Sequence, residues 1–414
     1  MNRIWIMLTA IVVTTGCIAT VTPEAPLSDR HQPSGLNSKF SYDGTAFVDY
    51  TKQSRAVISK ARTDLNDENH KLVVNANAPF DLAPSANCPR GTTKPYRRGV
   101  LLTHGLTDSP YFMQYLAVFL QENCFRVMAI VLPGHGTRPG DLLDVTWEEW
   151  AKAVAYGTNA LAQEADQIYL AGFSTGGTLS IYQSLRDPRV KGLMLLSPAV
   201  AVTPMAFIAN WHKIYSWTAE KGRWLDVMKD EDPFKYESFP KNAVDQIHLL
   251  TKEVKTRLSG NKFALPVFIA ASKDDSTVDI SATFGFFRQT TNPHNKMVLY
   301  SNKPAAVPAE IDTARIEVVN SALPNQKILS SAHTAIMLPP DDTHYGANGK
   351  YAYCLHYYPK EMEKYRTCKN KNGNYLGELT DENLKTGVMQ RLMYNPHFDS
   401  LKVSMKKFVA ALPE

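Results

Sequence analysis

The stretch Gly172-Phe173-Ser174-Thr175-Gly176-Gly177 decides how this chain is expected to fold. It has the spacing G-x-S-x-G and lies between an apolar run at 167–171 and a segment of helical spacing at 175–185. A serine on a sharp turn from strand to helix has strained backbone angles, so its neighbours must lack bulk. The first turn of the helix also points free N–H groups toward the serine hydroxyl. We therefore predict a nucleophile at Ser174.

The alternation of strand and helix extends on both sides of this motif. Apolar runs predict strands at 100–103, 126–132, 190–196 and 265–271, and helices are expected at 111–121 and from Thr146, where Glu149 completes a capping box. This alternation predicts an α/β fold with a mostly parallel central sheet and helices on both faces. Ligands of such sheets bind at the carboxyl ends of the strands, where Ser174 is expected to lie.

Three motifs resemble those of the α/β-hydrolase family, within it the monoacylglycerol-lipase and serine-aminopeptidase-like branch. They are His104-Gly105-Leu106-Thr107, Pro133-Gly134-His135-Gly136 and Gly-Phe-Ser-Thr-Gly at 172–176. The resemblance implies the α/β-hydrolase fold and serine hydrolase chemistry without a metal or an organic cofactor. It also implies a helical lid at about 200–262, a region whose aromatic side chains suit an apolar acyl chain.

The remaining catalytic groups are expected in the order that this fold uses, serine, then acid, then histidine. The family's D-x-x-V pattern after a strand matches Asp275 and Val278, with Asp274 as the main alternative acid and Asp279 as a weaker one. His333 follows a short apolar run at 326–331 that predicts another strand, and His344 is the alternative base.

A negative oxygen in the reaction needs preorganised donors. The resemblance implies two, the backbone N–H groups of Leu106 and Thr175. It implies that His104 and His135 shape loops near the site instead of transferring protons.

The N-terminal segment resembles that of a bacterial lipoprotein. Arg3 precedes an apolar run at 4–13, and Thr14-Thr15-Gly16-Cys17 follows. This pattern predicts a signal peptide at 1–16, lipidation of Cys17, membrane attachment through that lipid, and a location in the bacterial cell envelope facing the periplasm or exterior. The alternative is a plain signal peptide with an incidental cysteine. Residues 17–95 are expected to be a tether and leader, with one helix at 47–61.

The other cysteines support export. Cys88, Cys124, Cys354 and Cys368 allow three disulfide pairings, and we favour the two that join neighbours in the sequence, Cys88–Cys124 and Cys354–Cys368. No spacing typical of a zinc site is present, so we expect no metal. The hydrolase domain is expected at 96–414, with a disulfide-pinned excursion at about 337–396.

Composition excludes several function classes. Apolar residues make up 44% and charged residues 21% of the 414 residues, which is typical of a globular enzyme. The net charge of +5 is too mild to indicate a nucleic-acid partner, and no apolar run reaches the roughly 18 residues of a spanning helix. We predict an esterase or lipase-like enzyme that acts on a small-molecule or lipid ester. An aminopeptidase, a thioesterase and a lipoprotein that only binds remain alternatives.

Overall fold

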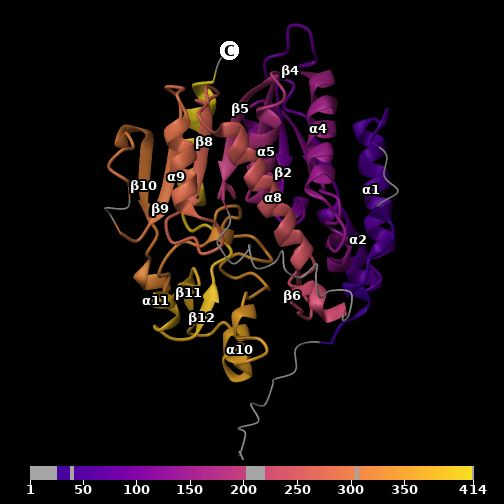
Figure 1. Cartoon of the computed structure of the whole chain (residues 1–414), viewed down its shortest axis with the longest axis vertical. Coiled ribbons are helices and arrows are strands. Elements are labelled where there is room, and N and C mark those ends of the chain that lie inside the picture. Colours follow the sequence, from indigo (N-terminus) through magenta and orange to yellow (C-terminus); the bar gives the residue numbers. More distant parts are fainter. Residues whose placement is uncertain (1–25, 38–41, 202–219, 304–306, 413–414) are drawn as a thin grey trace, which may run out of the picture.

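The computed structural model describes residues 26–37, 42–201, 220–303 and 307–412. Its strands are β1 (Phe80–Leu82), β2 (Tyr96–Thr103), β3 (Phe125–Ile130), β4 (Ala165–Phe173), β5 (Val190–Leu196), β8 (Val267–Ser272), β9 (Lys296–Ser301) and β10 (Ile316–Asn320). They form one eight-stranded sheet in the order β1-β3-β2-β4-β5-β8-β9-β10 (Figure 1). Only β1 runs antiparallel to its neighbour among these described strands. The predicted α/β fold with a mostly parallel sheet is confirmed.

Helices cover both faces of this sheet. One face carries α4 (Trp147–Glu164), α5 (Thr175–Ser184), α8 (Lys241–Leu258) and α9 (Ile280–Gln289), which lie in front of the strands in Figure 1. The other face carries α3 (Gln114–Glu122) and α12 (Phe398–Ala410). The expected capping box is present at the start of α4, where the Thr146 N–H donates to Glu149 Oε2 at 2.7 Å.

Two apolar cores result, because successive side chains of a strand point to opposite faces of the sheet. Along β2, Leu101 packs into the core beneath α4 and α5, whereas Val100 and Leu102 pack into the core beneath α3 and α12. All three side chains are fully buried. This burial on both faces explains why the strands read as continuous apolar runs in the sequence.

One expected feature differs from the structure. The run at 326–331 is not a strand; it makes single bridges through Ile328 to Leu323 and Leu376, so His333 follows an irregular segment. Within the expected lid at 200–262, α8 is a regular helix that packs into the core through Ile247, Leu250 and Val254. Residues 202–219, with four of the aromatic side chains expected in the lid, lie outside the described residues.

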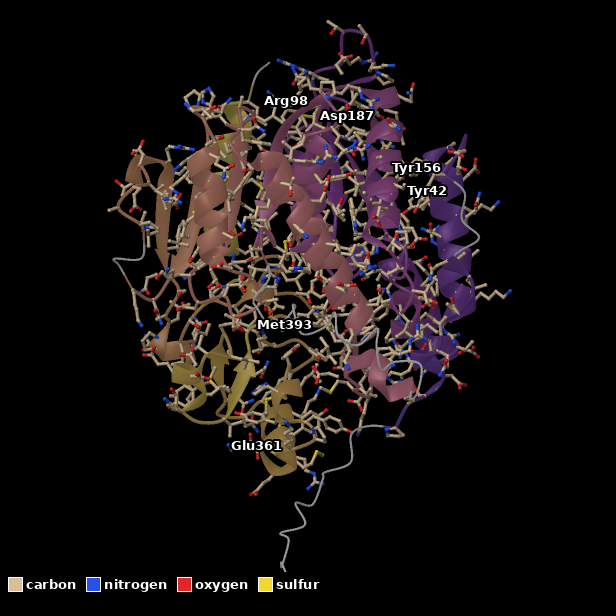
Figure 2. The ribbon with its side chains drawn as sticks, viewed as in Figure 1. Tyr42, Arg98, Tyr156, Asp187, Glu361 and Met393 are labelled. Carbon is tan, nitrogen blue, oxygen red and sulfur yellow. A yellow bond between two sulfur atoms is a disulfide. The ribbon has the colours of Figure 1, made fainter. Side chains whose placement is uncertain are left out.

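The expected boundary at residue 95 does not separate the leader from the hydrolase fold. Helix α1 (Phe47–Ala61) occupies the range predicted for it, α2 (Asp67–Asn77) follows, and β1 joins the central sheet. Tyr42 and Tyr156 lie side by side between α1 and α4, with ring centroids 5.1 Å apart (Figure 2). The leader from residue 42 onward is therefore part of the folded unit. The predicted signal peptide and Cys17 lie outside the described residues.

The expected excursion at 337–396 gathers at one end of the sheet. It contains α10 (Met362–Lys369), β11 (Tyr375–Gly377), α11 (Asp381–Leu384) and β12 (Met389–Arg391), drawn in orange and yellow at the bottom of Figure 1. The short strand β6 (Trp224–Asp226) also lies at the bottom of the picture. Strand β6 pairs with β7 (Phe239–Pro240), a short strand just before α8. The structure joins Cys354 to Cys368 within this excursion and Cys88 to Cys124 beside β3. Among the helices of the described ranges, none combines the length and apolar character that crossing a bilayer requires.

Replacing Tyr50 tests whether the leader contributes to the stability of the fold. Its hydroxyl donates to the Val131 carbonyl at 3.0 Å and accepts from the Val131 N–H at 3.1 Å, so one side chain satisfies the backbone just after β3. We expect Tyr50→Phe to lower the free energy of unfolding by about 1–3 kcal/mol, since both backbone groups lose their partner. Urea denaturation measures this loss. The control is Tyr375→Phe, because the Tyr375 hydroxyl makes no hydrogen bond within the described chain; equal effects of the two changes would contradict the expectation.

Candidate active site

The three side chains predicted as nucleophile, base and acid meet in space. His333 Nε2 lies 3.0 Å from Ser174 Oγ, and His333 Nδ1 lies 2.6 Å from Asp275 Oδ2. Ser174 and His333 are 8% and 5% exposed, so both side chains are largely withdrawn from solvent, and both line one cavity. A hydroxyl, an imidazole and a carboxylate in this order can activate the hydroxyl as a nucleophile.

The turn between β4 and α5 holds Ser174 in a strained conformation. Its φ of 52° and ψ of −116° are unfavourable for a residue with a side chain. A Cβ atom on Gly172 would lie 2.2 Å from the Gly176 carbonyl group, and a Cβ atom on Gly176 would lie 2.0 Å from the Thr103 oxygen at the end of β2. Both glycines are therefore required for the turn to pack this tightly against the sheet.

The hydrogen bonds favour Asp275 as the acid and His333 as the base. Asp275 Oδ1 accepts hydrogen bonds from the N–H groups of Thr277 and Val278, at 2.8 and 3.0 Å, which turns Oδ2 toward His333. Burial raises the pKa of the neighbouring Asp274, whose carboxylate has no hydrogen bond to His333. His344, the alternative base, pairs at 3.4 Å with Asp232 instead.

The two residues expected to supply backbone donors both lie at the cavity. Leu106 and Thr175 line the same cavity as Ser174. Neither backbone N–H donates a hydrogen bond to any described residue, so both are available to an incoming oxygen. The Leu106 loop is braced from the segment before β7: the Tyr236 N–H donates to the Thr107 carbonyl at 2.8 Å, and Lys235 Nζ pairs with Asp108 at 2.5 Å.

His104 and His135 have the structural place that the resemblance implies. The Leu132 N–H donates to His104 Nε2 at 3.1 Å, so the proton of His104 resides on Nδ1 and is donated to the Gly105 carbonyl at 2.8 Å. Burial lowers the pKa of His104 well below its usual range and lowers the pKa of His135 to about 4. Both rings are neutral at physiological pH and join the loop after β2 to the loop after β3.

Part of the chain has known relatives. Residues 94–303 match the family model described as serine aminopeptidase, S33. The chain belongs to the serine aminopeptidase S33 family. A thermostable monoacylglycerol lipase from Bacillus sp. (strain H-257) is 29% identical over 186 residues, which cover 44% of this chain and 71% of that protein.

Further similarities each cover about half of the chain. A carboxylesterase from Bacillus subtilis (strain 168) is 22% identical over 216 residues, covering 50% of this chain and 87% of that protein. Among solved structures, a monoacylglycerol lipase from Paleococcus ferrophilus has a TM-score of 0.41 and 20% identity, covering 50% of this chain and 86% of that one. The chain is a serine hydrolase of the S33 family, as its motifs predicted.

The S33 hydrolase has a cavity of about 250 Å³ at Ser174. The apolar side chains that line it, which we call the apolar wall, include Ala199, Leu225, Phe239, Val244, Ile247 and Val278. The polar side chains that line it, which we call the polar wall, include Asp108, Lys235, Glu237, Thr277, Tyr351, Tyr353 and Arg391. Within the described residues, no group of three or more histidine, cysteine, aspartate or glutamate side chains could hold a metal ion.

Most residues of the polar wall were not predicted from the sequence. Lys235 and Glu237 lie just before β7, and Tyr351, Tyr353 and Arg391 lie in the excursion, all outside the motifs that resemble the family. No local pattern marks these residues, because the folded chain brings them to the cavity from two separate insertions.

Glu237 is a buried carboxyl group in this wall. Tyr351 Oη donates to Glu237 Oε1 at 2.6 Å and the Glu231 N–H donates to Oε2 at 2.8 Å. Burial raises the pKa of Glu237 to about 7 from an ordinary value of 4.5, although the hydrogen bond from Tyr351 acts in the opposite direction. The folded state therefore binds this proton more tightly than the unfolded state.

The contribution of Glu237 to the stability of wild type should consequently fall as pH rises from about 4.5 to above 7, since ionised Glu237 is penalised only in the folded state. We expect the difference in unfolding free energy between Glu237→Gln and wild type to shift in favour of the variant by up to about 3 kcal/mol between pH 4 and 8. Urea titrations across this range measure the shift. The exposed Glu310→Gln is the control, and a pH-independent difference for Glu237→Gln would contradict the assignment.

Proposed function

We propose that this chain is an esterase that cleaves carboxylic esters with an apolar acyl group through a covalent acyl-enzyme. The observation that carries the proposal is the hydrogen-bonded series of Ser174, His333 and Asp275 at an apolar cavity. The series supports nucleophilic catalysis, and the apolar wall supports an acyl chain as the group bound beside it.

The residues have definite roles in this mechanism. Ser174 Oγ attacks the ester carbonyl carbon while His333 Nε2 accepts the hydroxyl proton, and Asp275 stabilises the resulting imidazolium. The N–H groups of Leu106 and Thr175 stabilise the oxyanion of the tetrahedral intermediate. The imidazolium then protonates the leaving alcohol, and the acyl group remains on Ser174. A water molecule, deprotonated by His333, then attacks the acyl carbon. The bond to Ser174 Oγ breaks, the imidazolium returns its proton to that oxygen, and the carboxylic acid leaves.

The substrate class is inferred from the wall of the cavity together with the relatives. The relatives from Bacillus carry the names monoacylglycerol lipase and carboxylesterase, which supports a lipid or small-molecule ester. The same acyl-transfer groups serve amides and thioesters, so an aminopeptidase or thioesterase uses identical steps. Rates on p-nitrophenyl esters of increasing chain length, compared with aminoacyl amides and acyl thioesters, rank the three bonds.

The catalytic roles have a direct test. We expect wild type to react with a fluorophosphonate probe and Ser174→Ala to lose both labelling and ester hydrolysis, by about 10⁴-fold or more, because no other group replaces the nucleophile. Asp275→Asn and Asp274→Asn form a matched pair: the first should lower kcat by orders of magnitude and the second should change it little, since Asp275 and not Asp274 is hydrogen-bonded to the His333 ring. A folded wild type that neither labels nor hydrolyses esters would favour a protein that only binds its ligand.

We also propose that the enzyme is lipid-anchored through Cys17 in the bacterial cell envelope, facing the periplasm or exterior. The pattern Thr14-Thr15-Gly16-Cys17 supports this placement, and the two disulfides are typical of an oxidising compartment.

The anchor can be tested in intact cells. We expect Cys17→Ser to move the enzyme from the membrane fraction to the soluble fraction and to abolish incorporation of radiolabelled palmitate, because the acyl chains have no attachment site. Unchanged partitioning with no palmitate in wild type would refute the proposal.

A further inference from the structure

The catalytic histidine is held by a part of the chain that lies outside the family match. The segment at 330–333 follows no strand, yet its backbone is fixed by the excursion. The His333 N–H donates to Glu378 Oε2 at 2.9 Å, and the Glu378 N–H donates to Ser330 Oγ at 3.1 Å. Asn383 Nδ2 donates to the same Ser330 oxygen at 3.0 Å. Glu378, Asn383 and the turn between them therefore enclose the segment that carries His333.

Arg391 extends this contact to the loop of the acid. Its Nε and Nη2 donate to the two oxygens of Glu378 at 2.8 and 2.9 Å, and Nη2 also donates to Thr277 Oγ1 at 2.6 Å. The Thr277 N–H in turn donates to Asp275 Oδ1 at 2.8 Å. A continuous path thus runs from the His333 backbone through Glu378, Arg391 and Thr277 to Asp275. The acid and base loops are joined a second time, in addition to their direct hydrogen bond.

Burial makes this ion pair a costly arrangement. Glu378 is 0% exposed, and its pKa is held at about 2 because the charge and hydrogen bonds of Arg391 outweigh the desolvation that acts in the opposite direction. Buried ion pairs add little net stability over apolar side chains of the same volume. A gain in stability therefore does not account for the bidentate pair of Glu378 and Arg391. A requirement to fix the positions of the loops that carry His333 and Asp275 does account for it.

We propose that Glu378 and Arg391 are positioning residues that fix His333 and Asp275 relative to each other. This inference rests on the proposed function for its kinetic consequence. Glu378 does not line the cavity and acts only through the His333 backbone and Arg391. Arg391 reaches the cavity wall, so a comparison of the two residues separates positioning from substrate binding.

The kinetic test uses Glu378→Gln, Arg391→Met and the double variant. We expect each single change to lower kcat by about 10–100-fold with KM within about threefold, because a small displacement of the base affects the reaction and not binding. The double variant should lose no more than the larger single loss, since both residues act along one path. Arg391→Lys should recover part of the rate, because an ammonium group can bond Glu378 or Thr277 but lacks the bidentate fork.

Arg126→Met is the matched control. Arg126 is also buried and pairs with Glu164 and Asp81 at 2.7 and 2.6 Å, at a distant edge of the sheet. We expect this variant to lose stability without a change in kcat per active site, counted by end-point labelling with the fluorophosphonate. Unchanged kcat in folded Glu378→Gln and Arg391→Met, or a loss in KM alone, would overturn the proposal.

A spectroscopic readout separates this proposal from the proposed function. The short Nδ1–Oδ2 contact predicts a far-downfield proton resonance of His333, assigned by its disappearance in Asp275→Asn. In Glu378→Gln and Arg391→Met this resonance should shift or broaden, whereas in Arg126→Met it should not move. The resonance reports the geometry even if wild type hydrolyses no ester, and an unperturbed resonance in both variants refutes positioning.

Discussion

The close approach of the β4–α5 turn to the end of β2 is the constraint on which the site depends. Gly176 lies so near the Thr103 oxygen that no side chain fits between them, and this contact sets Ser174 at a positive φ of 52°. Ser174, Thr175 at the start of α5 and Leu106 in the loop after β2 then line one cavity. The nucleophile and its donors thus come from adjacent parallel strands, whose carboxyl ends meet at one edge.

What the sequence predicted well were features with a local physical cause. The buried run at 190–196 became β5 without a change of bounds, and the capping box at Thr146 began α4, since burial on both faces and a satisfied helix end leave their marks within a few residues. The choice between Asp274 and Asp275 needed the structure, because only the direction of each carboxylate distinguishes them. The strand expected before His333 is absent because Ile328 makes isolated bridges to Leu323 and to Leu376 of the excursion and does not pair with a strand of the central sheet.

The leader and the excursion, which no motif describes, meet at one segment. Residues 230–239 lead the chain into β7, and both the leader and the excursion form hydrogen bonds with them. From the leader, Arg62 and Asn77 each donate to the Pro233 carbonyl at 2.9 Å. From the excursion, Tyr345 donates to Asp232 at 2.7 Å and Tyr351 donates to Glu237. The two additions to the hydrolase core therefore act together on the segment that braces the Leu106 loop.

The segments around the catalytic histidine are rich in buried polar side chains because their backbone is irregular. Segments without strand or helix partners must satisfy their N–H and C=O groups elsewhere, and buried side chains such as Glu378 supply those partners. A carboxylate that accepts from the His333 N–H cannot remain ionised in a dry site without a cation, and Arg391 provides it in a bidentate geometry that an ammonium group could not reproduce. An irregular loop at the catalytic histidine thus requires a charged pair behind it, and the excursion that supplies the pair also forms one wall of the cavity. In this enzyme the position of the base and the shape of the substrate site are consequently set by the same insertion.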